Sequence, residues 1–377
     1  MEATQKPRIV TLTQVSMSIA CTIIGVGILA FPRITVNYAK TAAPIATIAA
    51  VILIMGGGLT LSYLGNQYRD NTLFEYADRI IGKWLGGIIA LLFSIYFLEL
   101  AALSAREFGE VVATVVLPRT PIEVTVLVML FLAASASRND IAVFARILTF
   151  YMPFVYFPML VITILTLKNA QFVNIFPALD LSHSTKVSGI ARATLVVAAL
   201  FQNYVIIGLF IPFMYQPKKA WKGVLLGVGA AGMLFIMLIY GTMAVFGIEE
   251  MHHLLWPTLE LGKTAALPTF FIERLDPIIV AVWVTTVFTG LLSSYYVAIQ
   301  GLSHLFRFKN HKVFTVALIP FVFILAMQPP NVVDLYKIVE TIGVTGLLFS
   351  IGYPVLLLVL HSLRKVREKR KDRMEAV

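Results

Sequence analysis

Charged residues are scarce in this chain of 377 residues: only 13% are aspartate, glutamate, lysine or arginine, whereas 59% are hydrophobic. The mean hydropathy is +0.86. A water-soluble domain of this length has a much more polar composition, so a soluble protein is excluded. Long apolar runs recur from end to end, as in chains that cross a bilayer repeatedly. The composition predicts a polytopic membrane protein with no room for a separate soluble domain.

Cysteine is also scarce, because Cys21 is the single one, and this excludes an internal disulfide bond. The sequence has no phosphate-binding loop, no catalytic-triad pattern and no nucleotide-binding motif. His252 and His253 follow Glu249 and Glu250, but their spacing matches no zinc pattern. We therefore predict neither an enzyme nor a bound metal or cofactor.

The net charge of +10 is unevenly distributed along the chain. Seven basic residues gather directly after the last apolar run: Arg364, Lys365, Arg367, Lys369, Arg370, Lys371 and Arg373. A basic cluster beside a membrane helix is typical of contact with anionic lipid. We interpret residues 364–377 as a basic cytoplasmic tail that faces membrane lipid, with a partner-binding tail as the alternative. No nucleic-acid partner is predicted.

Ten membrane spans can be drawn along the apolar runs, within one transmembrane domain of residues 1–363. They cover residues 11–36, 43–68, 84–117, 122–137, 141–167, 187–215, 221–247, 278–305, 313–327 and 332–363. A short surface helix is expected at residues 73–81. With both termini in the cytoplasm, every inner loop carries lysine or arginine, as cytoplasmic loops usually do. The predicted fold class is an all-α polytopic membrane protein.

Two of these spans are interrupted in a similar way. Gly25 and Gly27 precede Pro32 in the first span, and Gly208 precedes Pro212 in the sixth. Glycine and proline weaken a helix, and backbone freed at membrane depth must line a cavity or bind a ligand. Interrupted helices at matching positions of two halves indicate an inverted repeat with a binding site between them. The repeats would be residues 11–167 and 187–363; two kinked packing helices are the alternative.

The segment Gly25–Arg33 (GVGILAFPR) resembles the first-span motif of the amino acid/polyamine/organocation transporter superfamily. Within it, the chain resembles one branch, the B subunits of bacterial spore germinant receptors. The supporting segments are LAFPRI at residues 29–34, AVFARI at 142–147, WPTLEL at 256–261 and FIERLD at 271–276 with Trp283 beyond. The chain departs from many relatives at Gln202-Asn203-Tyr204, where a motif with Gly and Glu is expected, so the resemblance does not specify the ligand.

This resemblance implies a ten-helix, five-plus-five inverted repeat of the LeuT type, with discontinuous helices one and six. It implies a protein of the inner membrane of the dormant spore. There it would bind a small nutrient, typically an amino acid, and signal with A-type and C-type receptor subunits to start germination.

A zwitterionic amino acid needs partners for both charges. Its carboxylate suits exposed N–H groups at the first-span break, and its ammonium suits free carbonyls near residues 20–24 or 201–204. In this superfamily the third and eighth spans usually form the side walls. The candidate ligand-binding residues are Thr22, Gly25, Val26, Gly27, Ile28, Tyr96, Phe97, Leu100, Leu200, Phe201, Gln202, Asn203, Thr285, Thr286 and Thr289. Each of them alone is more often a packing residue.

Several charged residues lie at membrane depth, where charges are costly and usually functional. Glu99 lies near the middle of the third span, and Arg146 lies about two turns into the fifth. In sodium-coupled relatives a cation sits between spans one, five and eight, and Arg146 is a candidate substitute for that ion; a snorkelling arginine is the alternative. Glu107 is also among the charged residues at membrane depth, and solvation near the outer end of the third span is its alternative.

Three functions remain open at this point. The first is a nutrient sensor of a germinant receptor, and the second is an autonomous proton-coupled amino-acid permease. The third is a structural or conducting subunit without a ligand of its own.

Overall fold

The protein is described here from a computed structural model that covers residues 7–175, 187–264, 276–308 and 310–375. Within these ranges the chain is helical apart from short connections and one isolated bridge between Val10 and Met214. Among the described residues, six helices are long and apolar enough to cross a membrane, and a bent pair makes a seventh if it counts as one span. The expected all-helical membrane fold is therefore confirmed.

The helices of the first half of the chain agree closely with the predicted spans. They are α1 (Leu12–Ile23), α2 (Phe31–Ala39), α3 (Ala43–Gln67), α4 (Leu73–Ile81), α5 (Lys83–Val111), α6 (Ile122–Ser137) and α7 (Ile141–Thr166). A π-helical turn, Val112–Val116, extends α5. The surface helix at residues 73–81 is found at the predicted residues.

The second half contains α8 (Val187–Leu200), α9 (Ile207–Phe210), α10 (Ala220–His253), α11 (Pro257–Thr264), α12 (Asp276–Leu305), α13 (Lys312–Ala317), α14 (Ile319–Ala326), α15 (Val332–Leu347) and α16 (Tyr353–Glu375). Helix α10 continues beyond the predicted end at Gly247, where a φ of 71° kinks it. The predicted ninth span is divided into α13 and α14, because Pro320 at the start of α14 cannot continue the hydrogen-bond ladder.

Local sequence explains where two of these helices begin. Thr11 accepts a hydrogen bond from the Gln14 N–H (3.2 Å), and the Gln14 side chain accepts one from the Thr11 N–H (2.9 Å). Thr72 and Glu75 form the same reciprocal cap at α4. Such capping boxes satisfy two of the free N–H groups at a helix start. Gly82, with a φ of 91°, makes the tight turn from α4 into α5.

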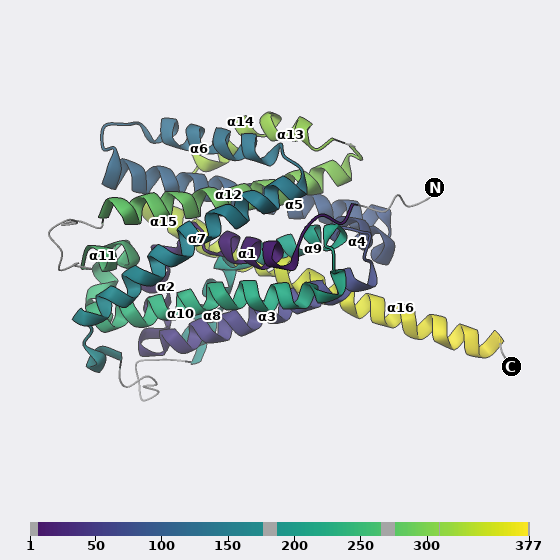
Figure 1. Ribbon diagram of the computed structural model, residues 1–377, viewed down its shortest axis with the longest axis horizontal. Helices are drawn as coiled ribbons and strands as arrows, with labels where there is room; N and C mark the ends of the chain where they lie inside the picture. The colour runs from purple at the N-terminus through teal and green to yellow at the C-terminus, as the bar shows by residue number, and fades with distance from the viewer. Residues whose placement is uncertain (1–6, 176–186, 265–275, 309, 376–377) are drawn as a thin grey trace.

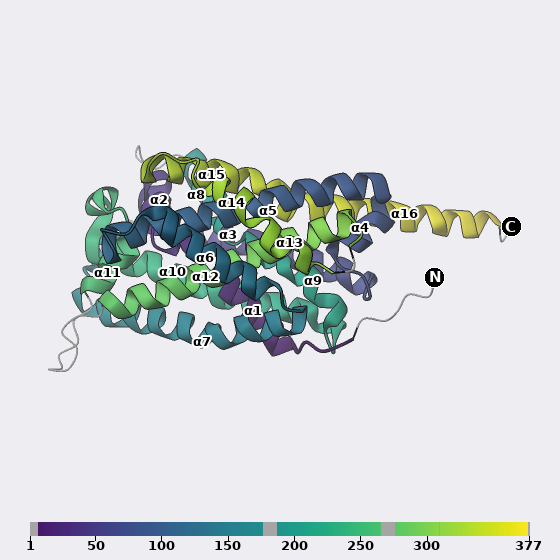
Figure 2. The same ribbon diagram turned by 90° about the horizontal axis from the view of Figure 1, so that it is seen from above.

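The long helices pack side by side along the long axis of the molecule (Figure 1). Helix α12 packs along α5, while α1 contacts α10, α7 and α12 and is thereby enclosed. Helices α4 and α9 lie at one end of the bundle, and α11 lies at the other (Figures 1 and 2). The broken first span thus lies inside the bundle rather than at its lipid-facing edge.

Helix α16 extends past Leu363 into the predicted tail and projects from the bundle at the α4 end (Figure 2). The Arg364 guanidinium donates a hydrogen bond to the backbone oxygen of Arg79, at the end of α4 (2.8 Å). The predicted boundary between membrane domain and tail is therefore not a break in the helix.

Candidate functional site

The first predicted span is discontinuous where the glycine pair stands. Helix α1 ends at Ile23, a single 3-10 turn covers Val26–Ile28, and α2 begins at Phe31. The Gly25 N–H donates to the Ile23 oxygen over 2.7 Å, whereas the Ile28 N–H reaches the Gly25 oxygen only at 3.4 Å. The regular helical ladder is therefore interrupted at membrane depth.

The sixth predicted span is also discontinuous. Helix α8 ends at Leu200, a 3-10 segment covers Gln202–Ile206, and α9 follows. The two parts, Val187–Leu200 and Gln202–Phe213, are bent by 46°. Both expected breaks are thus present, but the sixth span breaks between Leu200 and Gln202, ahead of the Gly208 and Pro212 from which the break was predicted.

Asn203 connects the two breaks with α12. Its side-chain amide donates to the backbone oxygens of Thr22 (3.2 Å) and Gly290 (3.3 Å). The Ser294 hydroxyl donates to the Asn203 amide oxygen (3.0 Å). The Thr289 hydroxyl reaches the Cys21 oxygen at 3.3 Å. Carbonyl groups freed by the break in α1 are therefore satisfied by side chains of the sixth span and α12, as buried backbone groups must be.

Gln202 anchors the sixth-span break on the opposite side. The Tyr96 hydroxyl on α5 donates to the Gln202 oxygen (2.5 Å), and the Gln202 amide donates to the backbone oxygen of Gly343 on α15 (2.6 Å). Gln202 is only 1% exposed. Gln202 and Asn203 thus hydrogen-bond the sixth-span break to α5, α15, α1 and α12.

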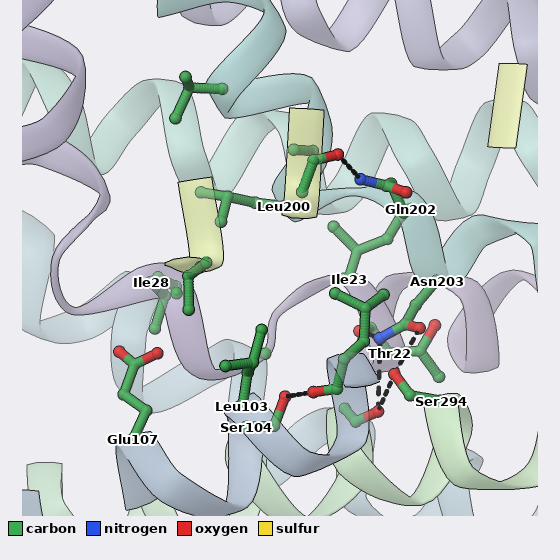
Figure 3. A pocket seen from close by; sticks show the side chains of 18 of the residues that line it. Thr22, Ile23, Ile28, Leu103, Ser104, Glu107, Leu200, Gln202, Asn203 and Ser294 are labelled. Carbon is green, nitrogen blue, oxygen red and sulfur yellow. Dashed lines mark hydrogen bonds between the residues drawn. The ribbon is translucent and has the colours of Figure 1, made fainter. Parts of the chain in front are cut away.

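A cavity of about 90 Å³ lies between the two breaks. Its walls come from both broken spans and from α5, α10, α12 and α15: Thr22, Ile23, Gly25, Gly27, Ile28, Ile34, Leu100, Leu103, Ser104, Glu107, Val196, Ala199, Leu200, Gln202, Asn203, Phe235, Gly290, Ser294, Val339, Glu340 and Gly343. Figure 3 shows Thr22, Asn203 and Ser294 at one side of it and Glu107 at the other. A cavity of this size admits only a small molecule.

The segment Trp256–Thr258, which carries part of the family resemblance, covers the first-span break. The Thr258 hydroxyl donates to the Ile28 oxygen (2.7 Å), and the Trp256 indole N–H donates to the Tyr336 hydroxyl (2.7 Å). Tyr336 in turn donates to Glu107 (3.0 Å). A loop motif that is distant in sequence therefore contacts the first-span break. The related segment at residues 271–276 lies outside the described residues, except for Asp276 at the start of α12.

The structure brings together about half of the predicted ligand-binding residues. Thr22, Gly25, Gly27, Ile28, Leu100, Leu200, Gln202 and Asn203 line the cavity. Tyr96 does not line the cavity but donates a hydrogen bond to Gln202, which does. Phe97 and Phe201 are buried in the core. Thr286 bonds its own helix at the Trp283 oxygen, and the half-buried Thr285 bonds its own helix at the Ala281 oxygen. Val26 lies in the 3-10 turn, within the break itself.

The two predicted charged candidates lie away from the cavity. Arg146 is exposed on α7 and Glu99 is half-buried on α5, and neither lines the cavity. In the described part of the chain, no hydrogen bond or ion pair of Arg146 supports its role as an ion substitute. Its exposed position fits a snorkelling arginine. The side chains that reach the interface of α1 and α12 belong to Asn203 and Thr289 instead.

Glu107 was not among the predicted ligand-binding residues. The sequence left it either at the interior or in solvent, and in the structure it is 2% exposed and lines the cavity. Its position within a long apolar run was the available signal, because a charge at membrane depth usually faces the interior. Ser294 and Gly290 were also missed, one turn beyond Thr286 and Thr289 on the predicted wall of the eighth span.

A polar cluster lies at the α2 and α15 side of the cavity. The Tyr38 hydroxyl donates to Glu340 (2.7 and 2.9 Å), and the Arg192 guanidinium pairs with the same carboxylate (2.8 Å) and lies over the Tyr38 ring. This cluster joins α2, α8 and α15. A second cavity of about 530 Å³ lies at the α4 end and shares no lining residue with the first.

An all-helical membrane protein with a cavity between two broken helices belongs, by fold, to the transporter-like class. The chain superposes on a solved Na⁺-coupled sialic acid symporter in a substrate-bound outward-open state, with a TM-score of 0.64 and 12% identity, over 91% of this chain and 79% of the symporter. It also superposes on Mhp1, a nucleobase-cation-symport-1 family transporter, in a closed conformation with bromovinylhydantoin bound. There the TM-score is 0.62 and the identity 12%, over 92% and 81% of the two chains. At these identities the likeness concerns the fold.

Sequence comparison identifies the family within this class. The family described as spore germination protein matches residues 9–334, and the chain belongs to it. Spore germination protein YndE of Bacillus subtilis (strain 168) is 26% identical over 363 residues, which is 96% of this chain and 98% of the relative. Spore germination protein B2 of the same organism is 26% identical over 332 residues, or 86% and 88% of the two chains. The resemblance found in the motifs is therefore confirmed.

Proposed function

We propose that this chain is the B-type membrane subunit of a nutrient germinant receptor. It binds a small germinant, most simply an amino acid, in the cavity between the two broken spans and thereby triggers spore germination. In this proposal the protein lies in the inner membrane of the spore with both termini in the cytoplasm, and it signals with A-type and C-type subunits. The proposal also retains ten spans arranged as a five-plus-five inverted repeat.

One observation carries the proposal: in a member of the germination family, a cavity lined by apolar residues and a few polar groups lies where two helices are interrupted. The Asn203 amide holds both breaks to α12 through the Thr22 and Gly290 oxygens. Backbone interruptions of this kind at membrane depth are tolerated where they line a cavity. The matching breaks in spans one and six are what an inverted repeat with a central site requires.

Signalling would follow from a shift between two conformations. A ligand shifts an equilibrium only by as much as it binds one state better than the other. The Tyr38–Glu340–Arg192 cluster joins α2, α8 and α15 beside the cavity, and Glu340 also lines the cavity. An occupant that changes the distance between these helices changes the cluster, and a partner subunit can read that change.

Deletion of this chain from the spores that contain it tests the proposal. We expect deletion spores to lose the response to at least one amino acid, measured as loss of light scattering when the core hydrates. Complementation with the wild type or with Gly229→Ala should restore the response, because an added Cβ at Gly229 meets nothing within 4 Å. Asn203→Ala should not restore it. Deletion spores that answer every nutrient as the parent does would contradict the proposal, and full specificity with Asn203→Ala would favour a subunit without its own ligand.

A proton-coupled amino-acid permease is the second candidate. The observation that favours it is the fold, which the chain shares with transporters. Reconstituted vesicles with an imposed pH gradient discriminate between the two functions. A permease accumulates labelled amino acid by itself, whereas a sensor binds the amino acid without accumulating it.

A further inference from the structure

The cavity contains two carboxylates, and only one of them is neutralised. Glu340 pairs with Arg192 and accepts hydrogen bonds from Tyr38. Glu107 accepts one hydrogen bond, from Tyr336, and among the described residues it has no cationic partner. Its neighbour Arg106 on α5 is already paired with Glu110 at 2.8 Å.

Glu107 is held rather than free to turn toward solvent. The Trp256 indole N–H donates to Tyr336, whose hydroxyl donates to Glu107 Oε1. Arg33 on α2 lies close enough to Tyr336 to act on it electrostatically, but it forms no ion pair with Glu107 in the described part of the chain. The carboxylate is 2% exposed and points toward the cavity (Figure 3). A buried carboxylate without a counter-charge is costly, and a cation within hydrogen-bond reach offsets that cost.

Three backbone carbonyls at the break, those of Cys21, Thr22 and Ile23, already accept hydrogen bonds. Asn203 donates to the Thr22 oxygen, and Thr289 donates to the Cys21 oxygen. The Ile23 oxygen accepts from the Gly25 N–H. Within the cavity wall, Glu107 is therefore the strongest available acceptor for a positive group, because hydrogen bonds to an ionised acceptor are about twice as strong as neutral ones.

We propose that Glu107 is the counter-ion for a primary ammonium group of the ligand, so that the cavity selects small amines and amino acids over their uncharged analogues. This inference rests on the proposed function and adds the chemical class of the ligand. The ammonium would lie at the Glu107 side of the cavity, across from Asn203 and Ser294. Because Tyr336 donates its hydrogen bond to Glu107 Oε1, Oε2 remains available to the ligand.

The test uses the full-length chain in nanodiscs and two sets of probes. The first set is L-alanine, L-valine and L-serine, and the second is the matching 2-hydroxy acids, which replace the ammonium with a hydroxyl. Wild type, Glu107→Gln, Glu107→Asp and Glu99→Gln are compared by equilibrium dialysis. Glu99 is the matched control, because it lies on the same helix, carries the same charge and does not line the cavity.

We expect the wild type to bind at least one amino acid and to bind its 2-hydroxy acid at least about 30-fold more weakly, as for loss of one member of a buried charge pair. Glu107→Gln should lose that preference, Glu107→Asp should retain part of it, and Glu99→Gln should bind as the wild type does. Amino-acid binding that is unchanged or tighter in Glu107→Gln would overturn the inference and make Glu107 a proton-binding group. Equal wild-type affinity for an amino acid and its 2-hydroxy acid would also overturn it. A wild type that binds none of the probes would overturn the proposed function, and the inference with it.

Discussion

The side-chain nitrogen of Asn203 lies 3.2 Å from the backbone oxygen of Thr22. This contact joins the interrupted sixth span to the interrupted first span, and the same amide also reaches the Gly290 oxygen on α12 (3.3 Å). Three chain segments that are distant in sequence therefore meet at one side chain. Since Asn203 also lines the cavity, an occupant of the cavity touches the group that holds the breaks together.

Replacement of Asn203 by alanine should weaken amino-acid binding at least about tenfold, because two buried carbonyls lose their donor. Asn203→Asp should be no better, since a carboxylate offers no N–H group and faces two carbonyl oxygens. Isothermal titration of the purified protein measures both effects. Ser294→Ala is the milder control, because its hydroxyl also bonds the Gly290 oxygen of its own helix. Wild-type affinity in Asn203→Asp would contradict this role.

Gly27→Ala should reduce the cavity. An added Cβ at Gly27 would lie 2.6 Å from the Cδ2 atom of Leu200, which also lines the cavity, so the leucine must move. We expect weaker binding with little loss of thermal stability, since the clash is with the end of a flexible side chain. The double variant with Leu200→Ala should recover affinity, and Gly229→Ala should bind as wild type does. Failure of the double variant to recover would show that the backbone at Gly27, and not its space, matters.

Tyr96→Phe should lower the thermal stability of the unliganded protein. It removes the hydroxyl that donates to the Gln202 oxygen, and Gln202 is buried, so the cost is about 1–3 kcal/mol. Thermal unfolding in detergent, followed by tryptophan fluorescence, measures the change. Tyr240→Phe, at a tyrosine of α10 that is 37% exposed, is the control and should leave the transition unchanged. Equal transitions for both variants would contradict the anchoring of Gln202.

Cysteine labelling should measure access to the cavity without background reaction from Cys21. Cys21 is 0% exposed, so the wild type should react very slowly with a small maleimide. Ser104 lines the cavity and is half-buried, so Ser104→Cys in a Cys21→Ser background should react measurably faster. Mass spectrometry of the intact protein follows the reaction. Similar rates for Cys21 and for a cysteine at position 104 would show that the cavity is closed to molecules of that size.

The sequence predicted the helices better than it predicted which side of each helix faces the cavity. The glycine pair in the first span and the polar Gln202-Asn203 in the sixth are local signals, so both broken spans were predicted from sequence, although the sixth span breaks at Leu200–Gln202 and not at Gly208 and Pro212. The sequence could not say which way Thr285 and Glu107 face, because both faces of α5 and α12 are apolar. A helix surrounded by lipid and protein lacks the polar face that indicates orientation in a soluble protein. The contacts of Trp256 and Thr258 were also out of reach, because only the folded chain brings that segment to Ile28 and Tyr336.

The most direct test of the central claim measures ligand binding and the location of the bound ligand in the same sample. Purified protein carrying Cys21→Ser and Ser104→Cys is titrated with the amino acid that it binds, while saturation and maleimide labelling are measured in the same sample. The account predicts one saturable site per chain and protection of the cysteine at position 104 with the same half-maximal concentration. Saturable binding that leaves the labelling rate of this cysteine unchanged would place the ligand elsewhere and contradict the account.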